Sequence, residues 1–324
     1  LHVREMFVAS AGLLMLMYVL CYGKVLDWLS SPRICLYVVL GPALLVFFLR
    51  MQHRSRNPYV DLAPLRQPKA LVGYLYMMIV MFFSTSTTLL TNYMTSILQV
   101  DATHSYTLYV WLLPGYALGA FVCFWWFRWQ RWRFRFLIAG GMACFALFFG
   151  LLYFGISPGS TYQSLFFPVF VRGAGMLTLI IAFALFAVEE LNPKYLICNA
   201  FFLIACRSVL APVMAASFYG NALLQQKFLC SLSEHFTLTD PAAAAKYAAA
   251  LDSSLARGHG YAEAAQLATG ELYSTLQQQS LLLALKDILG WLFAVSLLLA
   301  VISRFIPFHK TIRVRYAKAG DDMV

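Results

Sequence analysis

Apolar residues fall into eight runs of roughly twenty residues, separated by short polar segments except in one place. Such a run matches the length that a helix needs to cross a bilayer core, about 20 residues. Backbone groups in lipid must be paired within their own segment, so we expect helices and not open strands. The runs fall near 6–22, 33–50, 69–98, 105–127, 136–155, 164–188, 196–220 and 281–305.

The long polar segment, about 221–280, predicts a helical hairpin outside the membrane. Asp240-Pro241 is a helix start, with Asp as N-cap and Pro at the first helical position. The alanine-rich stretch that follows, up to Ala256, has high helix propensity. Gly258-His259-Gly260 predicts a turn, and a second helix from Tyr261 is expected to continue into the last span.

Charge predicts the orientation of the spans. The chain is 61% hydrophobic and 12% charged, with a net charge of +10. With the N-terminus inside, 16 of the 24 Lys and Arg residues lie in inner segments, six in outer segments and two within spans. This distribution follows the positive-inside rule and places both ends in the cytoplasm. The basic and aromatic run Arg128–Arg135 is therefore interpreted as a membrane-interface anchor, and no nucleic acid is expected as a partner.

Motifs for metals and nucleotides are absent from the sequence. The seven cysteines include no Cys-x-x-Cys pair, and six of them lie in or beside apolar runs. No phosphate-binding Gly-x-x-x-x-Gly-Lys loop and no HExxH motif occur. We therefore expect no cofactor, no metal site and no enzymatic activity.

Two arginines inside spans are the strongest functional signal. Arg172 lies in the outer half of the sixth span, and Arg207 near the middle of the seventh. A guanidinium within the bilayer costs at least about 2.5 kcal/mol, so it must face the bundle interior or water and find an acceptor. One interpretation is a cation that lines a cavity and binds substrate or couples to a proton site. The alternative is a structural bond to helix carbonyls, or a side chain that extends to the interface.

The third span is unusually polar. Between positions 84 and 96 it carries ten hydroxyl or amide residues, among them Thr88, Asn92 and Tyr93. Hydroxyls can bond back to their own helix, yet this many residues surround the helix, so some must face water or a partner. Together with Tyr76 and Phe83 they are expected to line an amphiphilic cavity.

Carboxylates are scarce in the spans. Asp287 lies about two turns into the outer end of the last span, beside Lys286. It is a candidate proton site, or one half of an interfacial ion pair.

Several short motifs occur in the order found in one transporter family. They are Pro58-Tyr59-Val60-Asp61-Leu62, Tyr93 with Gln99, Leu113-Pro114-Gly115, Arg172-Gly173-x-Gly175, Asn199 with Arg207, and Gln279 with Asp287. In this order, and with an outer hairpin before the last span, the whole chain resembles the fourteen-span drug:proton antiporters of the major facilitator superfamily, the EmrB/QacA type.

This resemblance implies an all-α integral membrane fold with about eight spans, comprising two extra central spans (1–51), a basic cytoplasmic connector (52–68), the six-helix C-terminal transporter domain (69–305) and a basic cytoplasmic tail (306–324). It implies proton-coupled export of small amphiphilic substrates by alternating access in a bacterial inner membrane. The bilayer and a periplasmic adaptor at the hairpin would be partners.

Two departures from the family pattern qualify this expectation. Segment 128–135 lacks the Asp-Arg-x-Gly motif that is common between the corresponding two spans of the family. The chain opens with Leu1 and lacks the family's first six-helix domain, which carries the usual coupling carboxylate, so we expect that missing domain as a further partner. Two other functions stay open: an uptake carrier for an anionic metabolite, which buried arginines would neutralise, and a non-transporting membrane scaffold that presents the hairpin.

Overall fold

The protein is all-helical in the part that the structure describes. The computed structural model describes residues 3–23, 25–55, 58, 60–129, 134–188, 195–220, 222–235 and 240–306, and it holds no β-strand in these ranges. The α-helices are α1 (Val3–Tyr22), α2 (Pro32–Arg54), α3 (Pro68–Ser84), α4 (Thr87–Ser96), α5 (Ala102–Val110), α6 (Leu112–Trp129), α7 (Phe134–Gly155), α8 (Phe166–Val188), α9 (Leu196–Ala205), α10 (Ala211–Tyr219), α11 (Ala222–His235), α12 (Pro241–Ala256) and α13 (Tyr261–Phe305). Short 3₁₀ turns occur at Trp28–Ser30, Ala63–Arg66 and Tyr162–Leu165, and a π-helical turn, Cys206–Leu210, joins α9 to α10.

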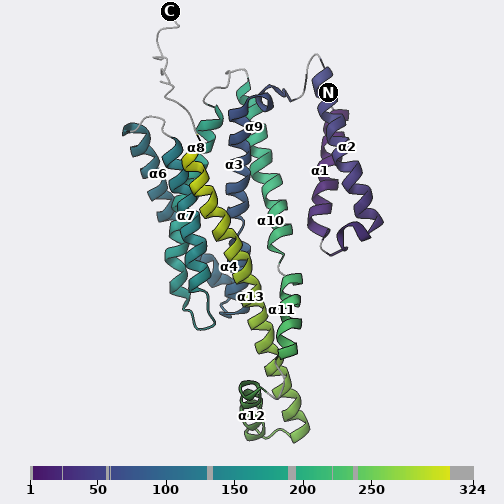
Figure 1. The fold of residues 1–324 in the computed structure, drawn as a ribbon, viewed down its shortest axis with the longest axis vertical. Coiled ribbons are helices and arrows are strands. Elements are labelled where there is room, and N and C mark those ends of the chain that lie inside the picture. The colour runs from purple at the N-terminus through teal and green to yellow at the C-terminus, as the bar shows by residue number, and fades with distance from the viewer. Residues whose placement is uncertain are drawn as a thin grey trace, which may run out of the picture.

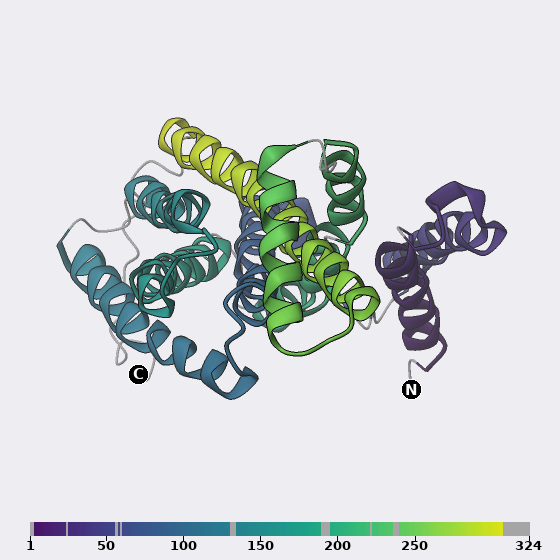
Figure 2. The same ribbon diagram turned by 90° about the horizontal axis from the view of Figure 1, so that it is seen from below.

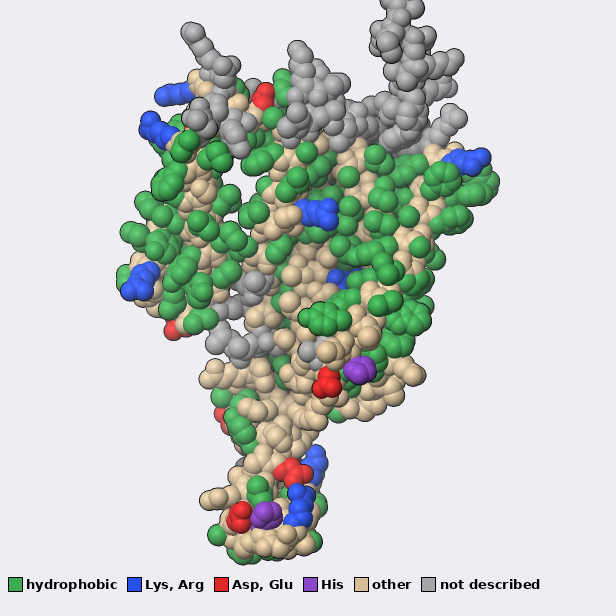
Figure 3. Space-filling view, turned by 180° about the vertical axis from the view of Figure 1, so that it is seen from behind, with side chains coloured by type: hydrophobic (Ala, Val, Ile, Leu, Met, Phe, Trp, Pro, Cys, Tyr) green, Lys and Arg blue, Asp and Glu red, His purple; other side chains and the backbone are tan. Residues whose placement is uncertain are grey.

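Within the described residues, eight helical segments are long and apolar enough to cross a membrane, which confirms the eight predicted runs. They are Val3–Tyr22, Pro32–Arg54, Pro68–Ser96, Tyr106–Trp129, Phe134–Gly155, Tyr162–Ala187, Cys198–Ala215 and Tyr261–Phe305. Apolar side chains cover most of the visible surface of these segments, with scattered charged side chains among them, and acidic, basic and histidine side chains cluster at the tip of the part that projects (Figure 3). The architecture is that of an all-α, multi-pass membrane protein.

Helices α3 to α10 and the second half of α13 form one bundle (Figure 1). Helix α8 packs against α3, α6 and α7, and α7 packs along α13. Helices α1 and α2 pair with each other at the side of the bundle (Figure 2), and α1 contacts α10. A hydrogen bond of 2.5 Å from Gln52 Nε2 to Glu5 Oε2 joins the end of α2 to the start of α1, and Gln52 Oε1 accepts from the Val60 amide at 3.2 Å.

Glycines bring α6 and α8 into close contact, as the spacing Gly115-x-x-x-Gly119 predicts. A Cβ atom added at Gly115 would lie 2.3 Å from the Phe170 carbonyl oxygen, and one at Gly119 would lie 2.7 Å from the Ala174 oxygen. From the other side, a Cβ atom at Gly173 would lie 2.8 Å from the Leu112 oxygen. Only glycine fits at this backbone-to-backbone contact.

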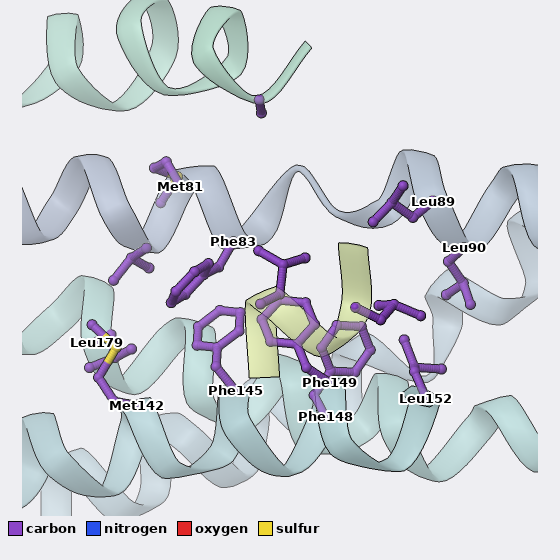
Figure 4. Packing of buried hydrophobic residues seen from close by; sticks show 14 of the residues in the cluster. Met81, Phe83, Leu89, Leu90, Met142, Phe145, Phe148, Phe149, Leu152 and Leu179 are labelled. Atoms are coloured by element: carbon purple, nitrogen blue, oxygen red, sulfur yellow. The ribbon is translucent and has the colours of Figure 1, made fainter. Parts of the chain in front are cut away.

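Aromatic side chains fill the centre of the bundle. Phe83 of α3 points toward α7, where its ring centroid lies 5.6 Å from that of Phe145 and 5.5 Å from that of Phe149 (Figure 4). Leu90 of α4 lies beyond the break between α3 and α4 and belongs to the same buried cluster. The two short helices therefore pack as one membrane crossing.

The outer segment contains more helix than the sequence predicts. Helix α11 occupies the first part of it, and both α11 and α12 pack against α13. The N-cap at Asp240 is confirmed, since its carboxylate accepts from the Ala242 amide at 3.1 Å. The predicted continuation is also confirmed: α13 runs unbroken for 45 residues, about 67 Å at 1.5 Å per residue. Since a bilayer core is about 30 Å thick, its first half, with α12, projects beyond the spans (Figure 1).

Some predicted features lie outside the described residues. They are the centre of the interface anchor, 130–133, and the basic tail from 307 onward. At the described edge of the anchor Trp129 is exposed, and the Arg304 guanidinium lies 4.4 Å from the Phe136 ring centroid.

Candidate functional site

The third membrane crossing is broken near its middle. Helix α3 ends at Ser84, α4 begins at Thr87, and the residues between them form a turn. Local hydroxyls bond to the backbone here: Thr85 Oγ1 donates to the Met81 carbonyl at 2.8 Å, and Thr88 Oγ1 donates to the Thr85 carbonyl at 3.1 Å. Such bonds offer the backbone an alternative to the helix ladder, which explains why a hydroxyl-rich segment interrupts the span. The sequence predicted polarity at this position but one continuous run.

Arg172 of α8 lies against this break. Its side chain is buried, and Nη2 donates to the Ser84 carbonyl at the C-terminal end of α3. The guanidinium carbon lies 5.6 Å from the Phe148 ring centroid. A cation at a helix C-terminus complements the partial negative charge of the last carbonyls. The bond to Ser84 is a structural bond to a helix carbonyl. This was the predicted alternative to a role in binding substrate.

Arg172 nevertheless retains donors without an acceptor. Nε and Nη1 are buried and have no hydrogen-bond partner in the described structure, and neither does Ser86 Oγ at the same break. A guanidinium carries five N–H donors, and leaving buried donors unpaired costs roughly 1–3 kcal/mol each. The three unsatisfied atoms mark this break as a place where an added acceptor would be stabilised.

Phenol groups surround the guanidinium. Tyr219 of α10 donates to the Phe82 carbonyl at 2.8 Å, so a second carbonyl at the end of α3 is satisfied from another helix. The phenol groups of Tyr109 and Tyr116, like that of Tyr219, lie near enough to Arg172 to interact with it electrostatically. No local sequence pattern distinguishes these three tyrosines from packing tyrosines, so they were not predicted as site residues.

A half-buried strip of polar atoms links the helices beside Arg172. The Tyr116 hydroxyl and the Ser84 hydroxyl both contact Met176 Sδ, at 3.5 Å and 3.3 Å. The hydroxyls of Thr91 and Tyr109 lie 3.0 Å apart. Weak acceptors and neutral hydroxyls of this kind suit an amphiphilic ligand, whose polar groups need orientation while its body packs against aromatic rings.

Arg207 does not join Arg172. It lies on the π-helical turn between α9 and α10, near the middle of its span, and its side chain is exposed in this chain. Single π-helical turns inside helices occur often at functional sites. An exposed guanidinium at this depth cannot face lipid cheaply, so this face of α9 and α10 requires water or another protein segment.

The predicted residues of the third crossing separate into different environments. Tyr93 is fully buried and donates to the Ser157 carbonyl at 2.8 Å, a contact that anchors a loop. Thr88 is exposed. Asn92 is half-buried and lines a polar groove of ≈ 440 Å³ between α4, α11 and α13, together with Ser96, Gln225, Ser274, Gln277, Gln278 and Leu281.

Tyr76 and Asn199 make buried contacts within the bundle. The Tyr76 hydroxyl lies 3.3 Å from Ser303 Oγ of α13. Asn199 Oδ1 accepts from the Tyr74 hydroxyl at 2.5 Å, which joins α9 to α3. Asp287 is exposed on α13 and lines two surface grooves whose lining does not include Arg172. Of the eight predicted site residues, Arg172 and Thr88 contact the break, and Arg172 alone reaches it from another helix.

Comparisons with known proteins assign no family. No protein-family model matches the chain, and no curated protein matches it. Within the described residues no group of three His, Cys, Asp or Glu side chains could hold a metal ion.

Proposed function

We propose that this chain is the C-terminal part of a proton-coupled multidrug efflux transporter that works by alternating access in a bacterial inner membrane. The observation that carries the proposal is the broken third crossing, with the buried and incompletely bonded guanidinium of Arg172 against it. Transporters commonly bind their substrates where interrupted helices meet near the middle of the membrane.

The arrangement supports a moving element as well as a binding site. The Ser84 carbonyl accepts from a side chain of α8, and the Phe82 carbonyl accepts from a side chain of α10 in addition to the Thr85 amide. A displacement of α8 or α10 therefore changes how the break is bonded. Alternating access requires such coupling between a binding site and packed helices. The exposed face that carries Arg207 would meet the further six-helix domain that the family resemblance implies.

The proposed site is tested by Arg172→Met and Arg172→Lys in the encoded protein. We expect Arg172→Met to abolish export of a lipophilic cationic dye from energised cells while membrane insertion is retained, because the donors to the ligand are removed. Arg172→Lys should restore part of the export. Arg257→Met on the outer hairpin is the matched control. Export at the wild-type rate in Arg172→Met would refute the site.

A second candidate function is uptake of an anionic metabolite. Two arginines lie within the spans, whereas no Asp or Glu side chain is buried among the described residues. The free donors of Arg172 would match a carboxylate or phosphate oxygen. Radiolabelled substrate distinguishes the two directions: uptake predicts higher accumulation of a labelled carboxylate in energised cells, and efflux predicts lower accumulation of the dye.

A further inference from the structure

Two grooves meet at Asp287 on the surface of α13. The first, ≈ 590 Å³, is walled by Tyr153, Phe228, Leu283, Gly290, Trp291 and Ala294. The second, ≈ 390 Å³, is walled by Phe218, Leu224, Ile288 and Trp291. Helix α11, which lies alongside α13 (Figure 1), supplies residues to both grooves. Except for Asp287 and one lysine in each groove, almost all of the lining is apolar.

Charges of both signs line this apolar surface. Asp287 belongs to both grooves, Lys286 of α13 to the first, and Lys227 of α11 to the second. No ion pair of 4.0 Å or less joins these three side chains to each other or to another residue in the described part of the chain. One carboxylate and two ammonium groups, close together but unpaired, match a ligand that carries a cation and an anion on adjacent atoms.

The depth of Asp287 in the bilayer identifies the source of that ligand. Asp287 lies 17 residues before Arg304, about 26 Å along the helix, and a bilayer core is about 30 Å thick. With Arg304 at one boundary of the core, Asp287 therefore lies about 4 Å inside the opposite boundary, within reach of the headgroups there. Trp291, 64% exposed, lies one turn deeper, where tryptophan is enriched at membrane interfaces.

We propose that these grooves bind an outer-leaflet phospholipid with an ethanolamine headgroup. Its ammonium donates to the Asp287 carboxylate, and its phosphate accepts from Lys227 and Lys286. The acyl chains pack along the apolar walls on either side of Trp291. An anionic lipid without an ammonium would leave Asp287 facing a phosphate. A choline headgroup has no N–H group to donate to Asp287. The charges therefore select ethanolamine.

Lipid retention tests this proposal without reference to transport. The protein is purified from membranes and incorporated into nanodiscs of mixed phosphatidylethanolamine, phosphatidylcholine and phosphatidylglycerol, and the lipids retained on release are counted by native mass spectrometry. The wild type should retain phosphatidylethanolamine preferentially. Asp287→Asn and Lys227→Ala/Lys286→Ala should each reduce this retention about tenfold, the value of one charge-assisted hydrogen bond.

Matched controls come from the outer hairpin. Asp252→Asn and Lys246→Ala change the same residue types at exposed positions of α12, beyond the spans, and should retain lipid like the wild type. Equal retention of the three lipids by the wild type would overturn the proposal, and so would unchanged retention in both groove variants. Because Asp287 and Lys227 are exposed, their replacement removes charge without disturbing packing.

Discussion

Two helices of this protein start behind similar residues and are completed in different ways. Helix α12 starts outside the spans behind Asp240, whose carboxylate accepts from the Ala242 amide at 3.1 Å. Helix α4 starts inside the membrane behind Ser86, which makes no side-chain capping bond and whose hydroxyl is buried without a partner. Both Asp and Ser favour the N-cap position. The first helix is completed by its own cap, whereas at the second the bonds from other helices go to the preceding end of α3.

The difference shows what each environment demands. On the projecting hairpin, water can satisfy any backbone group that a cap leaves free. At the break between α3 and α4 no water competes in the bilayer core, so side chains of α8 and α10 supply the bonds to α3. The start of α12 is therefore a local property of the sequence. The break is a property of the assembled bundle, and it can change when the bundle changes.

The largest effect on stability is expected for Tyr219→Phe. This change removes the Tyr219 bond to the Phe82 carbonyl, which keeps only a bond from the Thr85 amide at 3.2 Å, at a cost of about 1.5 kcal/mol. The ring stacking on Phe82, with centroids 5.2 Å apart, is retained. Thermal unfolding in detergent measures the loss. Tyr273→Phe, at an exposed position of α13, should change little. Equal effects of the two changes would mean that α10 does not hold the break.

An intermediate effect is expected for Asp240→Ala. Loss of the N-cap costs about 1 kcal/mol and should be confined to α12, because the hairpin is stabilised locally. Hydrogen exchange of amides 242–256 should accelerate while exchange within the spans stays unchanged. Asp240→Ser should restore most of the protection. Faster exchange spread across the bundle would show that the hairpin and the spans unfold together.

The smallest effect on stability is expected for Ser86→Ala. Its hydroxyl has no partner, so its removal should change the free energy of unfolding by less than about 0.5 kcal/mol or stabilise the protein slightly. If the unpaired atoms at the break serve a ligand, transport should nevertheless fall. A loss of stability as large as that of Asp240→Ala would instead show that Ser86 caps α4.

The spans could be predicted from sequence because each follows from length and apolarity alone. The start of α12 and the unbroken course of α13 were predictable for the same reason: local signals, an Asp-Pro pair and an uninterrupted helical segment, decide them. The break after Ser84 was not predicted. Hydroxyl residues allow a helix or a turn, and the outcome depends on Arg172 and Tyr219, which lie 88 and 137 residues away from their partners in sequence.

Only the energetically costly part of the candidate site, the buried charge, could be predicted from the sequence. Arg172 stood out because a guanidinium in a membrane needs a reason to be there. Tyr219, Tyr116 and Met176 did not, since such residues occur throughout apolar helices. Tyr93 illustrates the converse: its position in a polar span predicted a cavity, and its hydroxyl instead anchors the Ser157 loop. Hydrogen bonds between segments distant in sequence decide whether such a residue lies at the break or anchors a loop. A single sequence does not show these bonds.

Because α13 is long and unbroken, a small tilt within the spans produces a large displacement at its far end. About 26 residues, roughly 39 Å, separate Asp287 from the outer end of the helix at Tyr261. If α13 tilts as a rigid rod by about 10° at the level of Asp287, that end moves by about 7 Å. A small rearrangement among the spans thus becomes a displacement of the hairpin large enough to engage or release another protein. Conversely, a protein that holds the hairpin restrains the packing of α13 on α7 inside the membrane.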